Sequence, residues 1–179
     1  KILEIIEAQK LFNLPSSKLD ILIHPNSLVH AILVLKNGLK KFVYHETSMI
    51  IPIANAIFDE KIDIEDFYFP KKNSSKSQIE NLSFRKVDKK IFPVFKIMNR
   101  VNEYFSTPII INAANEVLVY KFLNKKIPFL AISRLISSIL NDRNYKKYAI
   151  KVPRNLSQIN LIDSWAKNKT LELIKKFYE

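Results

Sequence analysis

The chain has a single glycine, Gly38, among its 179 residues. Glycine tolerates positive φ and lets the backbone approach a phosphate closely, so nucleotide-binding loops use it repeatedly. A dinucleotide-binding fingerprint and a Walker loop each need at least two glycines at fixed spacing. Neither can occur in this chain. If a nucleotide takes part in the function, its main binding fold must therefore lie outside these residues.

The composition indicates an ordinary globular chain. Hydrophobic residues make up 47% of the sequence, enough for a core in one domain or two small ones. Apolar runs such as 109–111 are far too short to span a membrane. The chain has no cysteine, which excludes disulfides, thiolate metal sites and a cysteine nucleophile. Glu4 and Glu7 stand where a signal peptide would be apolar. We expect a cytoplasmic location and no membrane partner.

The net charge of +12 has two interpretations. It could serve a polyanionic partner such as RNA or a membrane surface. Alternatively, the lysines form a solvated surface, and we favour this because they occur as short pairs scattered along the chain. No aromatic RNA-binding motif or arginine-rich run accompanies them. We therefore do not expect a nucleic-acid partner, and an RNA-binding helical module remains the weaker alternative.

The first third of the chain predicts a mixed α and β region. The apolar spacing of residues 2–12 predicts a helix, which Pro15 ends because proline disfavours helix in the residue before it. Asn37-Gly38 between apolar runs is a strong hairpin signal. The expected strands are 19–24, 27–35 and 39–44, and 52–58 is expected to be a short helix.

The rest of the chain predicts a connector and then helices. Residues 59–87 are mixed and polar, with a possible extended edge at Leu82-Ser83-Phe84. From Phe92 onwards the apolar period becomes helical. The expected helices are 93–104, 112–123, 128–140 and a long C-terminal helix marked by residues 159–177. The fold class is therefore α+β: hairpin strands with flanking helices, followed by an all-α helical bundle.

Three groups of residues are chemical candidates: a pair of glutamates, a pair of histidines and a motif that starts at Asn112. Glu4 and Glu7, at positions i and i+3, share a helical face and could bind a hard divalent cation, although a solvated helix face is the interpretation that we prefer for such a pair taken alone. His24 and His30 would lie on one face of a single extended segment if Pro25 does not shift the register. Their spacing is not that of a zinc protease, and a structural role is the more common one.

The stretch from Asn112 to Glu116, Asn-Ala-Ala-Asn-Glu, stands at the start of a predicted helix. Asn112 is a plausible N-cap, and Glu116 in the first turn suits the helix dipole. Capping is our preferred interpretation of this motif.

Taken in order, these pieces resemble 1-deoxy-D-xylulose 5-phosphate reductoisomerases. The resemblance covers essentially the whole chain and rests on "KILEIIEAQKLF", "ILIHPNSLVHAIL", "MIIPIANAI", "FPVFKI" and above all "INAANEVLVYKFL". Each motif is weak by itself, but together, at these spacings, they are specific.

The resemblance implies a particular place in a larger enzyme. Members of this family have an N-terminal Rossmann domain, a catalytic domain, a connector and a C-terminal helical bundle. This chain resembles the part after the Rossmann domain: residues 1–58 end the catalytic domain, 59–87 form the connector and 88–179 form the bundle. The implied enzyme isomerises and reduces a phosphorylated sugar, 1-deoxy-D-xylulose 5-phosphate, with NADPH and Mg²⁺ or Mn²⁺, as a homodimer. The fragment alone is expected to be inactive.

The resemblance also assigns roles to individual residues. Lys1 matches the lysine that binds the substrate phosphate, and Glu4 matches a ligand of the divalent metal. Glu7 matches a second acidic position that supports the site without binding the metal. His30 matches a histidine at the active site and is the catalytic candidate. Met49 matches the methionine that approaches the nicotinamide.

Two departures from the family pattern define the alternative. The Asp-x-Glu pair that supplies the other metal ligands lies upstream of this chain in the family. The family's Gly-x-Pro-Asp-Met-Arg reads His-Glu-Thr-Ser-Met-Ile over residues 45–50, so His45 stands where glycine is usual. The alternative hypothesis is therefore a diverged, non-catalytic dimerisation or binding module of the same family.

Overall fold

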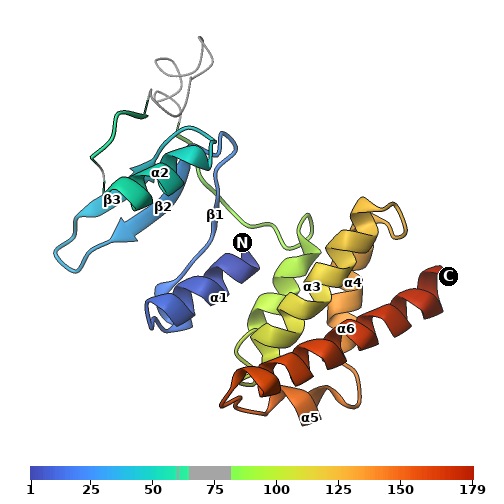
Figure 1. The fold of residues 1–179 in the computed structure, drawn as a ribbon. Helices are drawn as coiled ribbons and strands as arrows, with labels where there is room; N and C mark the ends of the chain where they lie inside the picture. Colours follow the sequence, from blue (N-terminus) through green and yellow to red (C-terminus); the bar gives the residue numbers. More distant parts are fainter. Residues whose placement is uncertain (60, 65–81) are drawn as a thin grey trace. The chain divides into compact units, whose positions relative to one another are not determined.

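In the computed structural model, residues 1–59, 61–64 and 82–179 are described, and they divide into two compact units (Figure 1). The bundle unit comprises Lys1–Ile21 and Val87–Glu179, and the hairpin unit comprises Leu22–Lys86. The expected α+β fold class is confirmed. The predicted domain boundaries within the larger family fold remain a prediction, and the predicted connector falls largely on 65–81, outside the described residues.

Three long helices form the centre of the bundle unit. They are α3 (Thr107–Leu123), α4 (Phe129–Leu140) and α6 (Leu156–Tyr178), each packed against the other two. The short helix α5 (Tyr145–Ala149) and the 3₁₀ helix η4 (Pro93–Arg100) complete the unit. Burying one leucine or isoleucine side chain contributes about 1.5–3 kcal/mol. The largest fully buried apolar side chains are Ile110, Leu118, Leu135, Ile139, Leu140, Ile162 and Ile174.

The starts of these helices correct two predictions. Helix α3 begins at Thr107 rather than Asn112, because Pro108 fits the first helical turn and the isoleucines after it continue the helix. Asn112 is therefore an exposed residue within the helix, and its predicted N-cap role is wrong. The helix predicted over 93–104 is a 3₁₀ helix that ends at Arg100. Helix α5 was not predicted because five residues are too few to show a period.

Helix α1 (Ile2–Leu11) belongs to the bundle unit, although α3 begins only at Thr107. Ile2 lies in the same buried core as the α3, α4 and α6 residues, and Leu3 and Ile6 pack against that core. At the other end of the helix, the Lys10 ammonium lies 4.7 Å from the centre of the Phe105 ring. A helix of ten residues is marginal by itself in water, so this docking stabilises it.

The hairpin unit is built on two antiparallel strands, β2 (Val29–Val34) and β3 (Lys40–Tyr44). The Asn37-Gly38 turn predicted between them is confirmed: Gly38 has a φ of 88°, and its N–H donates to the Leu35 carbonyl oxygen at 3.0 Å. Helix α2 (Ile50–Phe58) follows the hairpin. A second pair of strands, β1 (Leu22–Ile23) and β4 (Arg85–Lys86), joins the two ends of this unit.

A turn between β1 and β2 separates two of the histidines. Ser27 has a φ of 54°, and its N–H donates to the His24 carbonyl oxygen at 3.0 Å. His24 therefore follows β1 of one sheet, whereas His30 lies in β2 of the other. Pro25 lies in the turn between them, so the condition under which the two histidines would share one extended segment is not met. His24 instead stacks on Phe84, with ring centroids 5.0 Å apart, and its Nδ1–H donates to the Ser83 carbonyl oxygen at 2.9 Å.

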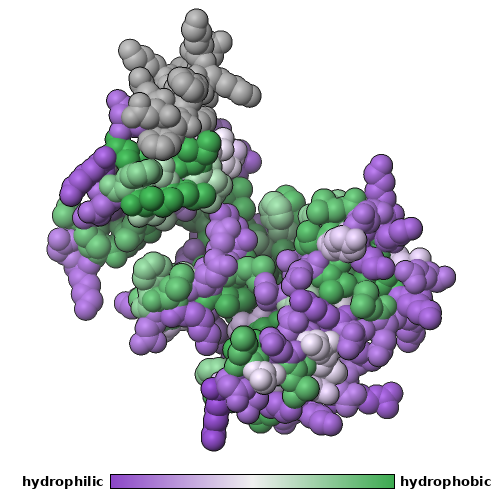
Figure 2. Space-filling model, viewed as in Figure 1, coloured by the Kyte–Doolittle hydropathy of each residue, from purple (hydrophilic) through white to green (hydrophobic). Residues whose placement is uncertain are grey.

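The surfaces of the two units differ in character. Figure 2 shows apolar side chains gathered over α2 and the hairpin, where Ile50, Ile53, Ile57 and Phe58 are exposed. On the visible face of the bundle unit, hydrophilic side chains are interspersed with apolar ones. Within the described part of the chain, no helix combines the length and apolarity needed to cross a membrane.

Candidate active site

The first turn of α1 carries the predicted phosphate and metal residues. The Lys1 ammonium lies 2.7 Å from the Glu4 carboxylate, and the two side chains are 58% and 60% exposed. The buried residues Ile2 and Ile5 lie on the opposite side of the helix, which directs Glu4 and Glu7 to solvent. The prediction that Glu4 and Glu7 share an exposed helical face is confirmed by this arrangement, whereas their roles are not tested by it.

The electrostatics around Glu4 favour its charged form. Partial burial acts to raise the pKa of Glu4, and the hydrogen bond and positive charge of Lys1 act to lower it. On balance the pKa of Glu4 is lowered from its usual value. A carboxylate in the first turn also interacts favourably with the positive end of the helix dipole. Glu4 is thus ionised at neutral pH, as a ligand of Mg²⁺ or Mn²⁺ must be.

The described residues supply only part of a metal site. No group of three or more histidine, aspartate or glutamate side chains comes together anywhere in ranges 1–59, 61–64 and 82–179. Mg²⁺ is usually held by one or two protein carboxylates together with water and substrate oxygens. Glu4 fits one such position by chemistry, charge and exposure, and further ligands would have to come from elsewhere.

His30 lies at an irregularity in the hairpin. Val29 pairs with Tyr44 and Ala31 pairs with Val43, so two steps along β2 match one step along β3. His30 is therefore the extra residue of a β-bulge, a feature that re-aims a side chain and is frequent beside active sites.

The re-aimed His30 ring contacts His45, the first residue after β3. The two rings are stacked, with centroids 3.7 Å apart and planes 5° from parallel. The Nε2 atom of His30 also lies 3.2 Å from the His45 carbonyl oxygen. His45 is half-buried, whereas His30 is exposed.

The remaining predicted residue, Met49, immediately precedes α2, and its side chain is 70% exposed. Met49 and His30 both belong to the hairpin unit, whereas Lys1, Glu4 and Glu7 belong to the bundle unit. The structure thus brings together Lys1 and Glu4 within one unit.

Two groups of contacts were not predicted from the sequence. The first is the His30–His45 stack: continuing the observed ladder from the Ala31–Val43 pair would place His30 opposite Tyr44, but at the bulge Val29 takes that place and the His30 ring stacks on His45. The available signal was the nearness of His45 to the end of the expected strand. The second is a polar network in the bundle unit, which has no local sequence signal because its members come from four segments.

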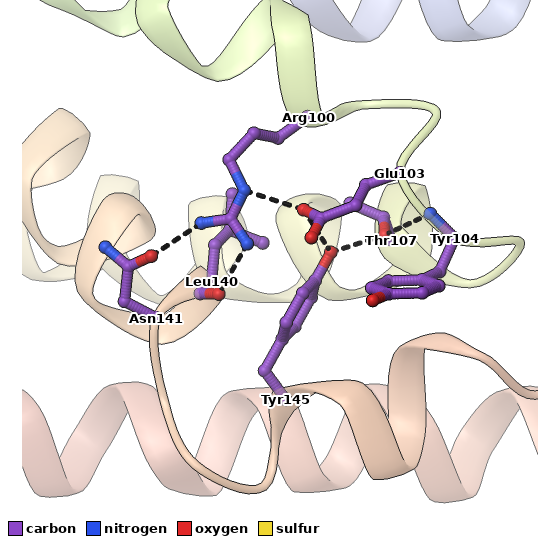
Figure 3. Close-up of polar contacts among 7 residues, drawn as sticks. All are labelled: Arg100, Glu103, Tyr104, Thr107, Leu140, Asn141 and Tyr145. Carbon is purple, nitrogen blue, oxygen red and sulfur yellow. Dashed lines mark hydrogen bonds and ion pairs between the residues drawn. The ribbon is translucent and has the colours of Figure 1, made fainter.

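Arg100 is the centre of this network (Figure 3). Its Nε–H donates to the Glu103 carboxylate at 2.7 Å, one Nη–H to the Asn141 side-chain oxygen at 2.7 Å, and the other to the Leu140 carbonyl oxygen at 2.8 Å. Leu140 is the last residue of α4, so the guanidinium caps the negative end of that helix.

A second branch of the network passes through Tyr145. Its hydroxyl lies 2.6 Å from the Thr107 hydroxyl and 3.3 Å from the Glu103 carboxylate, which can only accept a hydrogen bond. Tyr145 therefore donates to Glu103 and accepts from Thr107 (Figure 3). Burial raises the pKa of Tyr145; the Thr107 hydrogen bond opposes this shift, and the Glu103 charge reinforces it. This network holds η4, α3, α4 and α5 together and is structural.

The Asn-Ala-Ala-Asn-Glu motif is likewise engaged within the bundle. Ala113 and Ala114 are fully buried, and the Glu116 carboxylate lies 3.0 Å from the Lys167 ammonium of α6. Lys167 also lies 3.2 Å from Asp163. Its hydrogen bond to Glu116, and to a smaller extent that to Asp163, raises the pKa of Lys167. Small alanines let α6 approach α3 closely, so this motif contributes to helix packing.

Comparison with known proteins decides the family. Residues 45–169 match the family model for the DXP reductoisomerase C-terminal domain. The chain belongs to the DXP reductoisomerase family. The 1-deoxy-D-xylulose 5-phosphate reductoisomerase of Pelagibacter ubique is 40% identical over 173 residues, which is 94% of this chain and 43% of that protein. The enzyme of Pseudothermotoga lettingae is 30% identical, over 98% of this chain and 46% of its own length.

Solved structures of the family show the same fold. The Zymomonas mobilis reductoisomerase in complex with NADPH superposes with a TM-score of 0.78 at 28% identity and covers 97% of this chain and 44% of its own. A DOX-P reductoisomerase in complex with NADPH, fosmidomycin and magnesium superposes with a TM-score of 0.85 at 26% identity. The match covers 97% of this chain and 43% of that one. The chain thus spans less than half the length of the relatives it matches.

Proposed function

We propose that this chain is the C-terminal portion of an NADPH-dependent 1-deoxy-D-xylulose 5-phosphate reductoisomerase, which forms 2-C-methyl-D-erythritol 4-phosphate in non-mevalonate isoprenoid synthesis. The observation that carries the proposal is the first turn of α1, where an exposed, ionised Glu4 lies beside Lys1 on a helix docked on the family's C-terminal bundle. The proposed domains are 1–58 of the catalytic domain, the connector 59–87 and the bundle 88–179.

Lys1 and Glu4 can exchange their mutual contact for ligands at little cost. An exposed ion pair contributes about 0–1 kcal/mol, and both side chains here are more than half exposed. With Glu4 holding a cation, the Lys1 ammonium would be free to bind the substrate phosphate as a point charge. Glu7, one turn further along α1, adds negative charge beside the cation without serving as a ligand in this proposal.

The other two residues act from the hairpin unit. His30 offers a hydrogen-bonding imidazole at a β-bulge, and Met49 offers an exposed apolar side chain that suits the nicotinamide ring. A divalent cation at Glu4 would supply Lewis-acid polarisation of substrate oxygens, and NADPH would supply the hydride. Since one glycine cannot build a dinucleotide-binding loop, the main binding fold for NADPH lies outside this chain in this proposal.

The test compares this chain with a version extended upstream through the Rossmann domain. The extended protein is expected to oxidise NADPH in the presence of 1-deoxy-D-xylulose 5-phosphate and Mn²⁺, and the 179-residue chain alone is expected to give no turnover. Turnover by the short chain would overturn its inactivity. No turnover by the extended protein would overturn the enzymatic function and leave the non-catalytic binding module, to which the altered residues 45–50 point.

A homodimer is part of the proposal. Apolar side chains of both hairpin strands are exposed, namely Leu33, Val34, Phe42 and Val43, and such a surface favours pairing with another chain. Analytical ultracentrifugation of the extended protein is expected to give a mass of two chains. A monomer at micromolar concentration would contradict this. A cytoplasmic location also remains a prediction.

A further inference from the structure

The stacked histidine pair joins a residue of β2 to the residue that follows β3. The ring of His45 covers one face of the His30 ring at 3.7 Å between centroids. A glycine at position 45 would retain the backbone carbonyl that His30 contacts but would leave that face of His30 open. The ring of His45 is thus an additional contact that this sequence provides.

The hydrogen bonds of the pair decide which nitrogen atoms carry protons. A backbone carbonyl oxygen can only accept, so the Nε2 atom of His30 must carry the hydrogen that it donates to His45 at 3.2 Å. By the same reasoning, the Nδ1 atom of His45 carries the hydrogen donated to the Glu46 carbonyl oxygen at 2.6 Å. When His30 is neutral, its Nδ1 atom is therefore the acceptor.

This arrangement fixes His30 at both its face and its edge. The bulge at His30 directs the side chain beyond the regular ladder, the His45 carbonyl oxygen holds one ring nitrogen, and the His45 ring limits rotation of the imidazole. Aromatic pairs of this kind prefer defined separations and orientations. An exposed histidine at a bulge would otherwise sample several rotamers.

We propose that His45 is a positioning residue for His30: its ring and carbonyl hold the His30 imidazole in one orientation and one tautomer, with Nδ1 as a hydrogen-bond acceptor for a hydroxyl group of the sugar substrate. A hydroxyl is the matching group because it can donate, whereas ionised phosphate oxygens only accept. This inference rests on the proposed function, which places His30 beside the substrate.

The first experiment is nuclear magnetic resonance on the ¹⁵N-labelled 179-residue chain at about pH 8, where an ordinary histidine is neutral. We expect inter-ring nuclear Overhauser effects between His30 and His45, ring-current shifts of the His30 carbon-bound protons, and the Nε2–H tautomer of His30. In His45→Gly the ring-current shifts should disappear, and in His45→Phe they should persist. Retained cross-strand amide contacts between β2 and β3 of the hairpin unit would show that both variants fold. Absence of ring contact in the wild-type chain would overturn the inference.

The second experiment measures kcat and KM of the extended protein. Loss of one aromatic contact corresponds to roughly a threefold to tenfold effect, and we expect His45→Gly to lower kcat/KM for the sugar by that factor. His45→Phe, which keeps a stacking ring, should stay within about twofold of the wild type. In a His30→Ala background, His45→Gly should bring no further loss, because His45 acts through His30.

The outcomes separate this inference from the proposed function. Equal losses in the glycine and phenylalanine variants, or an unreduced loss in the His30→Ala background, would overturn the positioning role while leaving the enzyme intact. A wild-type extended protein without turnover would overturn the proposed function and with it the role of His30. The ring contact itself would still be read by magnetic resonance in the shorter chain.

Discussion

The hydroxyl chain from Thr107 through Tyr145 to Glu103 allows one stability prediction to be worked out in detail. In Tyr145→Phe, the fully buried Thr107 hydroxyl loses its acceptor at 2.6 Å. A buried polar group left unsatisfied costs about 1–3 kcal/mol. The bond to Glu103 is longer, at 3.3 Å, and the Glu103 side chain is 32% exposed, so water can replace it. We expect Tyr145→Phe to lower the free energy of unfolding by about 2 kcal/mol.

The partner substitution should be coupled to the first. Thr107→Val removes the hydroxyl that donates to Tyr145 and accepts from the Tyr104 N–H at 3.3 Å, and we expect it to cost about 1–2 kcal/mol. In the double variant, no buried hydroxyl is left without a partner. Its cost should therefore fall below the sum of the single costs by about 1 kcal/mol.

The assay is urea unfolding followed by the fluorescence of Trp165. It is the only tryptophan in the sequence and stacks on Tyr148 in the bundle unit, with centroids 4.4 Å apart, so it reports on that unit. Tyr120→Phe is the matched control because Tyr120 is 67% exposed, and it should change the free energy of unfolding by less than about 0.5 kcal/mol. Additive costs in the double variant, or an unchanged midpoint for Tyr145→Phe, would refute the reasoning.

Three further predictions concern pH, the hairpin turn and a helix cap. Burial raises the pKa of Tyr145 in the folded chain, so folding favours the neutral phenol. This contribution to the free energy of unfolding is complete below the ordinary tyrosine pKa of about 10. It is lost as the pH rises through the higher pKa of the folded chain. Urea midpoints should thus fall more steeply above pH ~10 in the wild type than in Tyr145→Phe; parallel curves would contradict this. Gly38→Ala should destabilise the hairpin by roughly 1–2 kcal/mol, because alanine rarely adopts a φ of 88°. A steric clash does not contribute, because an added Cβ meets nothing within 4 Å. Hydrogen exchange should accelerate in β2 and β3, with Trp165 unfolding unchanged, and unaltered exchange would count against it. Asn155→Ala removes the acceptor for the Gln158 N–H at 3.0 Å and should cost about 1 kcal/mol by Trp165 fluorescence, whereas Asn155→Asp should cost much less.

The locally encoded parts of the fold could be predicted from the sequence. The hairpin followed from Asn37-Gly38, because a two-residue signal decides that turn. Helix α1 followed from apolar spacing, and α4 began close to its proline. The start of α3 was misplaced because Asn112 resembles a cap by composition, whereas Pro108 and the packing of the isoleucines decide where the helix begins.

Contacts between distant segments could not be predicted. Nothing in residues 2–11 indicates that Ile2 is buried in the core that the later helices form, because that depends on packing across the chain. In the candidate site, the i, i+3 spacing predicted that Glu4 and Glu7 share a helical face. The same spacing separates Lys1 from Glu4 and explains their contact. The His30–His45 pairing depends on a β-bulge, which one extra residue creates without a composition signal.

The β1–β4 ladder has a consequence for how this chain can be cut and rejoined. The bundle unit is discontinuous in sequence, and the hairpin unit is inserted between Ile21 and Val87. Leu22 pairs with Lys86, so the insertion starts and ends at neighbouring points about 5 Å apart. The entropic cost of closing a loop grows only slowly with its length, so such an insertion lowers the stability of the bundle unit only slightly. The bundle unit therefore has the connectivity of a host domain, in which a short turn could replace residues 22–86 while α1 remains attached to α3.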